Sequence, residues 1–309
     1  MDSSGRMWAL ILAAAAVLGI VAGAIRNFET IAARIKRILT RRRPQEPQVE
    51  ISRVSDPEDD DLHEALILYK KRLPEHERDQ DDDIIRWFQE IEAETKNGIC
   101  ELKDYFLVAR LGDRVCGLMY FHYYPETKLA FVSYLVTDGD NDTTQSRVTN
   151  RLAKRAGKLL KKEAKGLIGF VAETDDPRRA ESSPKRLEAR ARIKLFRKIA
   201  QTQRAALMVL DMPYVQPRTS LEERDAQATP MVLIYARPGR INKLPFIPKA
   251  DGERILRFVY NTVYADEFPD SDGRYREHLR GLLEKQLAQL PDQIPTSLDD
   301  SESQATADP

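Results

Sequence analysis

The chain has 309 residues, and its 49 Lys and Arg side chains are balanced by 49 Asp and Glu side chains. This zero net charge gives no support to a nucleic-acid-binding protein, for which a basic excess is typical. The hydrophobic fraction of 42% is sufficient for a buried core. Two cysteines and no CxxC pair exclude a disulfide framework and disfavour a structural zinc site. GxGxxG and GxxxxGKS/T are absent, so Rossmann-type and P-loop nucleotide sites are not expected.

Residues 7–25 contain no polar side chain. As a helix, residues 8–25 would span roughly 27 Å, close to the thickness of a bilayer core. A basic run follows at 26–43, and such a run stays on the cytoplasmic side. We therefore predict a single-pass anchor with its N-terminus outside and the bulk of the chain in the cytoplasm, most simply at a bacterial inner membrane. The alternatives are a cleaved signal peptide ending near Ala22-Gly23-Ala24, or a buried apolar helix.

Residues 26–49 form a basic juxtamembrane linker in this interpretation. Within it, Phe28–Leu39 carries an apolar helical face opposite Arg and Lys side chains, a pattern that suits contact with anionic membrane lipid. The alternative is a plain stop-transfer flank. Pro44 and Pro47 then stiffen the connection to the rest of the chain.

The next part of the sequence predicts a strand, two helices and three strands. Leu62, Ala65, Leu66 and Tyr69 recur at helical spacing after an acidic start, and Pro74 ends that helix. A second helical stretch covers 84–91. The short turns between the three strands predict an antiparallel meander. The expected strands are Ile51–Val54, Tyr105–Leu111, Val115–Tyr124 and Leu129–Val136.

Helices and strands alternate in the remainder. Apolar residues at helical spacing predict helices at Thr143–Lys165 and Glu188–Ala200, and apolar runs predict the strands between and after them. The acidic tail 291–309 has no basic residue and is expected to be disordered. The further expected strands are Leu167–Ala172, Ala205–Leu210 and Met231–Tyr235, and the C-terminal helices are Ile255–Tyr264 and Arg276–Leu290.

This order predicts an α+β domain with one mixed central sheet flanked by helices. It resembles the GNAT (N-acetyltransferase) superfamily over residues 50–238, with 239–290 as a C-terminal helical extension. Four stretches carry the resemblance: the hairpin Asp104–Gly117, the strand end Tyr134–Thr137, the helix after it, and Ala191–Ala200.

The resemblance implies a fold in which an acyl-coenzyme A lies in a V-shaped gap between two central parallel strands. The pantetheine arm would pair with the backbone of Leu135, Val136 and Thr137. The pyrophosphate would bind to N–H groups at the start of the next helix. The cosubstrate is acetyl-CoA or another acyl-CoA, and no metal is implied. The corresponding phosphate-binding loop is Thr144, Gln145, Ser146, Arg147, Val148, Thr149 and Asn150.

Three residues are catalytic candidates. Glu173 follows the fifth predicted strand together with Asp176, where a carboxylate could take a proton from an amine; the alternative is a helix-start or loop role. Ser133 and Tyr134 lie near the expected splay point, and one of them should face the acyl group. His122 could also act as a base, but it is interpreted as a cross-strand surface or core residue.

The sequence departs from the family pattern in two places, and these departures motivate a second candidate function. The phosphate-binding stretch offers no glycine in either register, and Phe196 stands where the family has a tyrosine. The first hypothesis is a membrane-tethered, acyl-CoA-dependent N-acyltransferase acting on an amine of unspecified acceptor. The alternative is a catalytically degenerate GNAT-like binding or regulatory module at the membrane. The basic face of 151–165 has no interleaved aromatics, so nucleic acid is not an expected partner.

Overall fold

The computed structural model describes residues 48–73, 84–86, 89, 102–138, 142–217, 231–239, 244–267 and 273–297. The predicted anchor at 7–25, most of the basic linker and half of the second predicted helix, 84–91, lie outside these residues. Among the helices that the structure does describe, none is both long and apolar enough to cross a bilayer. Residues 49–309 form one compact unit, and the fold is that of this unit.

A seven-stranded mixed sheet organises the unit, in the order β1-β2-β3-β4-β5-β7-β6. Only β4 and β5 pair in parallel; every other neighbouring pair in this sheet is antiparallel. The predicted meander and the mixed sheet are therefore confirmed. The strands are β1 Val49–Val54, β2 Lys103–Leu111, β3 Arg114–Tyr124, β4 Leu129–Thr137, β5 Gly169–Asp175, β6 Ala205–Leu210 and β7 Met231–Pro238.

Helices connect and cover these strands. The Asp59 side chain caps the first of them by accepting from the Asp61 amide, as its acidic start predicts. β8 Phe246–Pro248 and β9 Gln293–Pro295 pair antiparallel in a second, two-stranded sheet. The helices are α2 Asp60–Arg72, α4 Asp142–Glu163, α5 Ser183–Thr202, α6 Lys249–Phe258, the π-helical η2 Val259–Val263, α7 Tyr264–Glu267 and α8 Arg274–Ala288.

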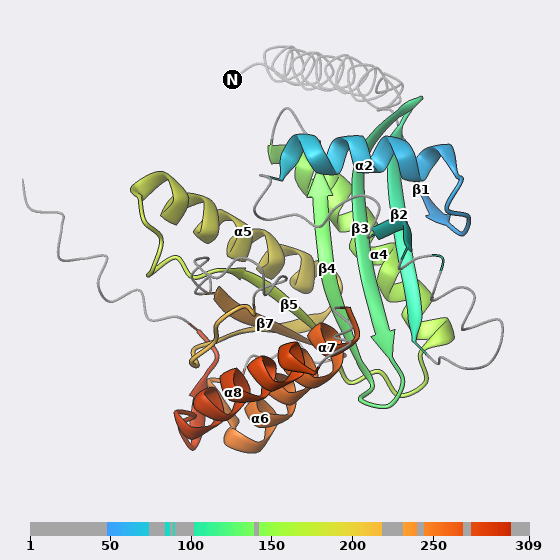
Figure 1. Ribbon diagram of the computed structural model, residues 1–309. Coiled ribbons are helices and arrows are strands. Elements are labelled where there is room, and N and C mark those ends of the chain that lie inside the picture. Colours follow the sequence, from blue (N-terminus) through green and yellow to red (C-terminus); the bar gives the residue numbers. More distant parts are fainter. Residues whose placement is uncertain are drawn as a thin grey trace, which may run out of the picture. The chain divides into compact units, whose positions relative to one another are not determined.

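The two faces of the sheet are covered by different helices. Along β5, Val171 packs into the core formed with the C-terminal helices, whereas its neighbour Ala172 packs on the α5 side. Along β3, Phe121 contacts the α4 side and Tyr120 the α2 side. Successive strand residues point to opposite faces, so α2 and the C-terminal helices share one face and α4 and α5 the other. Figure 1 shows α2 in front of β2–β4 and α4 behind them.

The C-terminal segment is part of the same core, not an appendage. The expectation of disorder from Pro291 is wrong for residues 291–297, because Ile294 is fully buried in the core of the C-terminal helices. Disorder was expected because the composition of 291–309 is polar and acidic, and one apolar side chain changes that composition little. Backbone amides elsewhere in the chain also donate to the segment: Val209 to the carbonyl of Thr296, Asp211 to Pro295 and Lys249 to Asp292.

A glycine lets α4 lie close against the sheet. A Cβ at Gly117 of β3 would stand 2.7 Å from Cγ1 of Val148 and 3.2 Å from the carbonyl oxygen of Val136. Any side chain at this position would push α4 away from β3 and β4. Gly117 is the last residue of the hairpin that carries the family resemblance, and it fixes how closely the helix after β4 approaches that strand.

Candidate active site

The two parallel strands separate halfway along their length. β4 and β5 are in register from Leu129 opposite Gly169 to Val132 opposite Ala172, and the pairing stops there. β4 continues to Thr137 beside β3, while β5 continues to Asp175 beside β7. The two strands therefore splay apart after Val132 and Ala172, as the resemblance implies; we refer to the edges of β4 and β5 beyond these residues as the crevice.

Solvent exposure agrees with an open crevice. Ser133, Tyr134, Leu135 and Thr137 are each partly exposed, although β4 is the middle strand of the sheet. On the neighbouring β3, every residue after Arg114 is buried. Partial exposure in the middle of a sheet is expected only where one neighbouring strand has moved away.

The backbone of β4 presents unused hydrogen-bonding groups to this crevice. The Asp138 amide donates to the Cys116 carbonyl on the β3 side, with an N···O distance of 2.8 Å. Backbone groups along an antiparallel strand alternate in direction, so the N–H and C=O groups of Leu135 and Thr137 point away from β3, toward the crevice. By the same alternation the N–H and C=O groups of Val136 face β3, and its side chain is buried on the α2 side, so Val136 directs no group toward the crevice, in contrast to the expectation from the resemblance.

Ser133 is the extra residue of a β-bulge at the mouth of the crevice. Tyr120 of β3 lies opposite Tyr134, and Phe121 lies opposite Val132, which leaves Ser133 without a cross-strand partner. The Ser133 hydroxyl lies 2.9 Å from Nε2 of His122, and Nδ1 of His122 bonds to a carboxylate oxygen of Asp104. Three neighbouring strands thus contribute a chain of hydrogen bonds that ends at the crevice.

Tyr134 turns away from this chain and packs on α2. Its ring meets the Tyr69 ring edge-on, with the centroids 4.8 Å apart. The two candidates named on β4 therefore have different surroundings: Ser133 bonds to His122, and Tyr134 joins the aromatic packing between α2 and the sheet.

Glu173 is the first residue of β5 beyond the paired segment. It lies inside the strand, not after it as the sequence suggested, and it belongs to the face that carries the C-terminal helices. Its carboxylate accepts hydrogen bonds from the Tyr214 hydroxyl, from the Tyr264 hydroxyl at 2.8 Å and from Nε2 of Gln216 at 3.1 Å. Burial raises the pKa of Glu173 to about 7, although these three hydrogen bonds act to lower it. A carboxyl group that titrates near 7 is suited to proton transfer at neutral pH.

Asp176 differs from Glu173 because its charge is fully paired. Its carboxylate accepts from the backbone amide and the guanidinium of Arg178, and Arg178 also bonds to Asp211 at 2.7 Å. Asp176 is 4% exposed. The loop role that the sequence left open for this residue accounts for its contacts.

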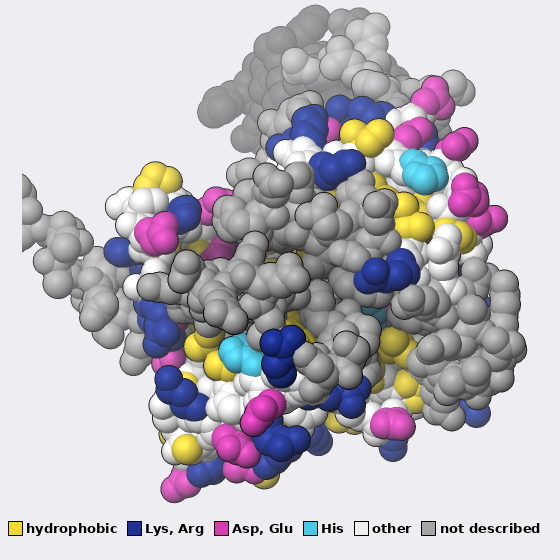
Figure 2. Space-filling model, viewed as in Figure 1, with side chains coloured by type: hydrophobic (Ala, Val, Ile, Leu, Met, Phe, Trp, Pro, Cys, Tyr) yellow, Lys and Arg dark blue, Asp and Glu magenta, His cyan; other side chains and the backbone are white. Residues whose placement is uncertain are grey.

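Positive side chains gather where β4 ends. Arg72 bonds to the Asp138 carboxylate, and Lys71 and Arg114 lie 3.5 and 3.6 Å from it. The Arg72 hydrogen bond is the main cause of a lowered pKa for Asp138. Three cations around one carboxylate leave a net positive charge there. Figure 2 shows α2 with its acidic first turn and its basic last turn at opposite ends.

The stretch expected to form a phosphate-binding loop is helical. Residues 144–150 lie in the first turns of α4, which begins at Asp142. Val148 and Thr149 are fully buried, and the Thr149 hydroxyl donates to the Gln145 carbonyl at 2.7 Å. The other members are partly exposed: Thr144, Gln145, Ser146, Arg147 and Asn150. Phosphate binding by this stretch remains a prediction, in which the backbone at the helix start is the available donor.

Four buried side-chain atoms of the described residues have no hydrogen-bond partner: Oδ1 of Asn150 on α4, Oγ1 of Thr174 on β5, Nε of Arg197 on α5 and Nε2 of His278 on α8. Phe196 of α5, which stands where the family has a tyrosine, is partly buried and packs against the core on the α5 side of the sheet.

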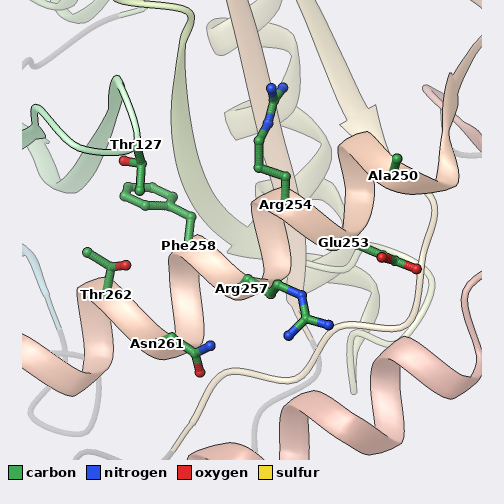
Figure 3. A pocket seen from close by; sticks show the side chains of 8 residues that line it. All are labelled: Thr127, Ala250, Glu253, Arg254, Arg257, Phe258, Asn261 and Thr262. Atoms are coloured by element: carbon green, nitrogen blue, oxygen red, sulfur yellow. The ribbon is translucent and has the colours of Figure 1, made fainter.

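A separate concavity of about 430 Å³ lies on the outer side of α6 and η2. Figure 3 shows that the Arg254 and Arg257 side chains point in different directions, so they do not converge on one anion. Arg254 also bonds to Asp251 at 3.0 Å. Across the ranges described, no three His, Cys, Asp or Glu side chains are grouped so that they could hold a metal ion.

Neither a family model nor a curated protein matches this sequence. Solved structures of similar fold include a proposed GNAT-family acetyltransferase from Bacteroides thetaiotaomicron, with 14% identity, a TM-score of 0.44, and coverage of 70% of this chain and 98% of that one. An N-acetyltransferase from Staphylococcus aureus has 18% identity, a TM-score of 0.37 and coverage of 62% and 98%. A Bacillus subtilis acetyltransferase solved with CoA has 14% identity, a TM-score of 0.35 and coverage of 61% and 97%. The strand order and the splayed parallel pair agree with the arrangement that the sequence resemblance implies.

Proposed function

We propose that the protein is an acyl-CoA-dependent N-acyltransferase. The observation that carries this proposal is the crevice between β4 and β5, where Leu135 and Thr137 present backbone groups with no strand beside them. An extended chain with alternating amide groups, such as pantetheine, can pair with such a strand edge in the way a further strand would. We propose acetyl-CoA or another acyl-CoA as the donor on this basis.

Charge and helix geometry support the placement of the nucleotide end. The start of α4 is the positive end of the helix dipole, which favours an anion. The chain passes from Asp138 to the start of α4 at Asp142 within a few residues. Lys71, Arg72 and Arg114 add positive charge around Asp138, which suits the phosphates of CoA.

Glu173 is the base in this proposal. It stands on β5 one residue beyond the last paired position, as Ser133 does on β4. An amine must lose a proton as it attacks an activated acyl group, and a carboxylate with a pKa of about 7 can accept that proton at neutral pH. Holding the amine and the acyl group together in one crevice supplies a further share of the rate.

We also propose that residues 7–25 tether the enzyme to a membrane, with the catalytic unit on the cytoplasmic side and the basic flank on anionic lipid. The supporting features are the uninterrupted apolar run and the basic residues that follow it. The acceptor is an amine, and no feature of the crevice specifies its class further.

The test uses the full-length chain in detergent. Isothermal titration with acetyl-CoA is expected to give saturable binding, and thiol release should follow when a reactive amine is added. Lys71→Glu should weaken binding a few-fold, and less so at high salt, because Lys71 is an exposed charge near Asp138. Lys70→Glu, the neighbouring reversal on α2, is the matched control.

Two results would separate the competing functions. Absence of binding at millimolar acetyl-CoA would contradict the proposal. Binding without thiol release across a panel of amines would favour the second candidate, a degenerate GNAT-like binding module. That candidate is motivated by Phe196 and by the lack of glycine in residues 144–150.

A further inference from the structure

Asp104, His122 and Ser133 stand on three adjacent strands and form one hydrogen-bonded line. Asp104 on β2 lies directly opposite His122 on β3 in the strand register. Nδ1 of His122 forms a hydrogen bond with Oδ1 of Asp104, and Nε2 of His122 lies 2.9 Å from Oγ of Ser133. The line begins in the interior of the sheet and ends at the first β4 residue of the crevice.

The hydrogen-bond partners of this buried line indicate which nitrogen of His122 carries the proton. The side chain of His122 is 3% exposed and that of Asp104 is 6% exposed. The second carboxylate oxygen of Asp104 accepts from the Tyr120 hydroxyl at 2.8 Å. A carboxylate has only acceptor atoms, so Nδ1 of His122 carries the proton, and Nε2 is left to accept from the Ser133 hydroxyl.

The environment of His122 also holds its ring in place. The Tyr120 ring meets it edge-on with the centroids 4.5 Å apart, and the Tyr124 ring lies 6.3 Å away on the other side. Nucleophile, base and orienting carboxylate therefore have the mutual contacts of a Ser–His–Asp triad, which is recognised by its geometry and not by its position in a sequence.

We propose that this triad makes Ser133 a nucleophile, so that the acyl group passes through a serine ester; this inference rests on the proposed acyl-CoA donor. Oγ of Ser133 attacks the thioester carbonyl, the hydroxyl proton moves to Nε2 of His122, and the C–S bond breaks with the electron pair leaving on the CoA thiolate. Ser133 is a partly exposed bulge residue on the β4 edge, and its hydroxyl is hydrogen-bonded to His122.

The second half of the reaction restores the triad. The acceptor amine attacks the ester carbonyl and gives its proton to Glu173. The C–O bond then breaks, and Oγ of Ser133 takes back the proton held on Nε2 of His122. The products are an amide and free CoA, and Glu173 releases its proton to solvent. Asp104 does not change protonation and acts as a positioning residue.

The first experiment tests the nucleophile without any CoA. A fluorophosphonate probe is added to the full-length protein, and the labelled residue is located by peptide mass spectrometry. We expect labelling of Ser133, its loss in Ser133→Ala, and retention of thiol labelling in Ser133→Cys with a thiol-directed probe. Asp104→Asn should slow labelling by about 10³–10⁴-fold, because it turns the imidazole to the wrong tautomer. Ser52→Ala, an exposed serine of β1, is the control.

The second experiment tests the acyl donor. Labelled CoA is mixed with acetyl-CoA and protein in the absence of amine, and exchange of label into acetyl-CoA is expected because an acyl-serine forms reversibly. Amide formation with no exchange and no labelling of Ser133 would overturn the triad and leave the proposed function standing. Labelling of Ser133 with no binding of acetyl-CoA would support the nucleophile and overturn the proposed function instead.

Discussion

Glu173→Gln is expected to lower the turnover number for acyl transfer by about 10²–10⁴-fold, the usual contribution of a positioned general base. Glutamine keeps the size of the side chain and can still accept a hydrogen bond from Tyr214 or Tyr264, but it cannot take a proton. Binding of acetyl-CoA should change little, because the donor is held by the β4 edge and the start of α4. Steady-state kinetics with one amine at saturating donor measures the effect.

The pH dependence of the same reaction tests the role of Glu173 independently. Because the pKa of Glu173 is about 7, the carboxylate form that accepts the proton is the minor form at pH 6 and the major form at pH 8. Turnover should therefore rise with pH through about 7 and then level off. A profile that is flat between pH 6 and 8, or a Glu173→Gln variant with full activity, would remove Glu173 from the mechanism.

Glu163→Gln is the matched control for that substitution. Glu163 is a partly buried glutamate at the end of α4 whose carboxylate accepts from the Tyr105 hydroxyl at 3.0 Å, so it resembles Glu173 in having a tyrosine partner. Tyr105 belongs to the α4 face of the sheet, opposite the face that carries Glu173. We expect its removal to leave turnover and the pH profile unchanged.

Glu173 should also make folding stability depend on pH. Between its ordinary value of 4.5 and its folded pKa of about 7, the folded protein holds a proton that the unfolded chain has released. The contribution of this group to stability is therefore complete below about pH 4.5 and is lost as the pH rises to 7. In Glu173→Gln this decrease of stability between pH 4.5 and 7 should disappear. Above pH 7 the free energy of unfolding of the variant should exceed that of the parent by up to about 3 kcal/mol. Urea unfolding at pH 5 and 8 measures both slopes.

Ile294→Ala is expected to lower the free energy of unfolding by about 2–5 kcal/mol, the usual cost of cutting back a fully buried isoleucine. Ile294 lies in β9 and contacts α6 so closely that a Cβ at Gly252 would meet its Cδ1 at 2.1 Å. A chain that ends at Leu290 should lose this anchor together with the backbone hydrogen bonds that Val209, Asp211 and Lys249 donate to the segment. Equilibrium urea unfolding gives both values.

Two controls make this result specific to the anchor. Gln293→Ala changes an exposed residue of the same strand and should alter the free energy of unfolding by no more than about 0.5 kcal/mol. A chain that ends at Ser297 keeps β9 and its backbone bonds and should unfold like the full chain. If the chains ending at Leu290 and at Ser297 unfolded at the same urea concentration, β9 would have no role in stability.

Local periodicity was sufficient to predict most helices and strands of the sheet. The apolar face of α4, with Leu152, Ala156 and Leu160, was visible at helical spacing and is buried in the structure. The tail is the segment where composition gave a wrong prediction. Residues 291–309 are acidic and polar, but residues 291–297 are ordered, with Ile294 buried in the core.

Strand register was the main obstacle at the candidate site. The turn at Gly112 pairs Leu111 with Arg114, and simple continuation of that pairing would place Asp104 opposite Phe121. A shift between Ala109 and Arg110 moves the register by one residue and brings Asp104 opposite His122 instead. A second bulge, at Ser133, then presents its hydroxyl to the same histidine. Neither bulge has a signal in the residues themselves, so the triad could not be predicted.

The hydrogen-bond partners of Glu173 could not be predicted from the sequence, for a different reason. Its three hydrogen-bond donors are 41, 43 and 91 residues further along the chain. Tyr264 belongs to the C-terminal helices, which the sequence placed in an extension beyond the GNAT-like domain. The position of Glu173 near the end of a central strand could be predicted, but the cause of its raised pKa depends on packing between distant elements.

We propose that the open edge of β4 binds an acyl-CoA through its backbone. Residue-resolved hydrogen exchange with and without acetyl-CoA tests this binding mode most directly. Amides of Leu135 and Thr137 should exchange rapidly in the free protein and become protected when acetyl-CoA binds. The Val136 amide, which faces β3, should be protected in both states and serves as the internal reference. Unchanged exchange at Leu135 and Thr137 with saturating acetyl-CoA would contradict the claim.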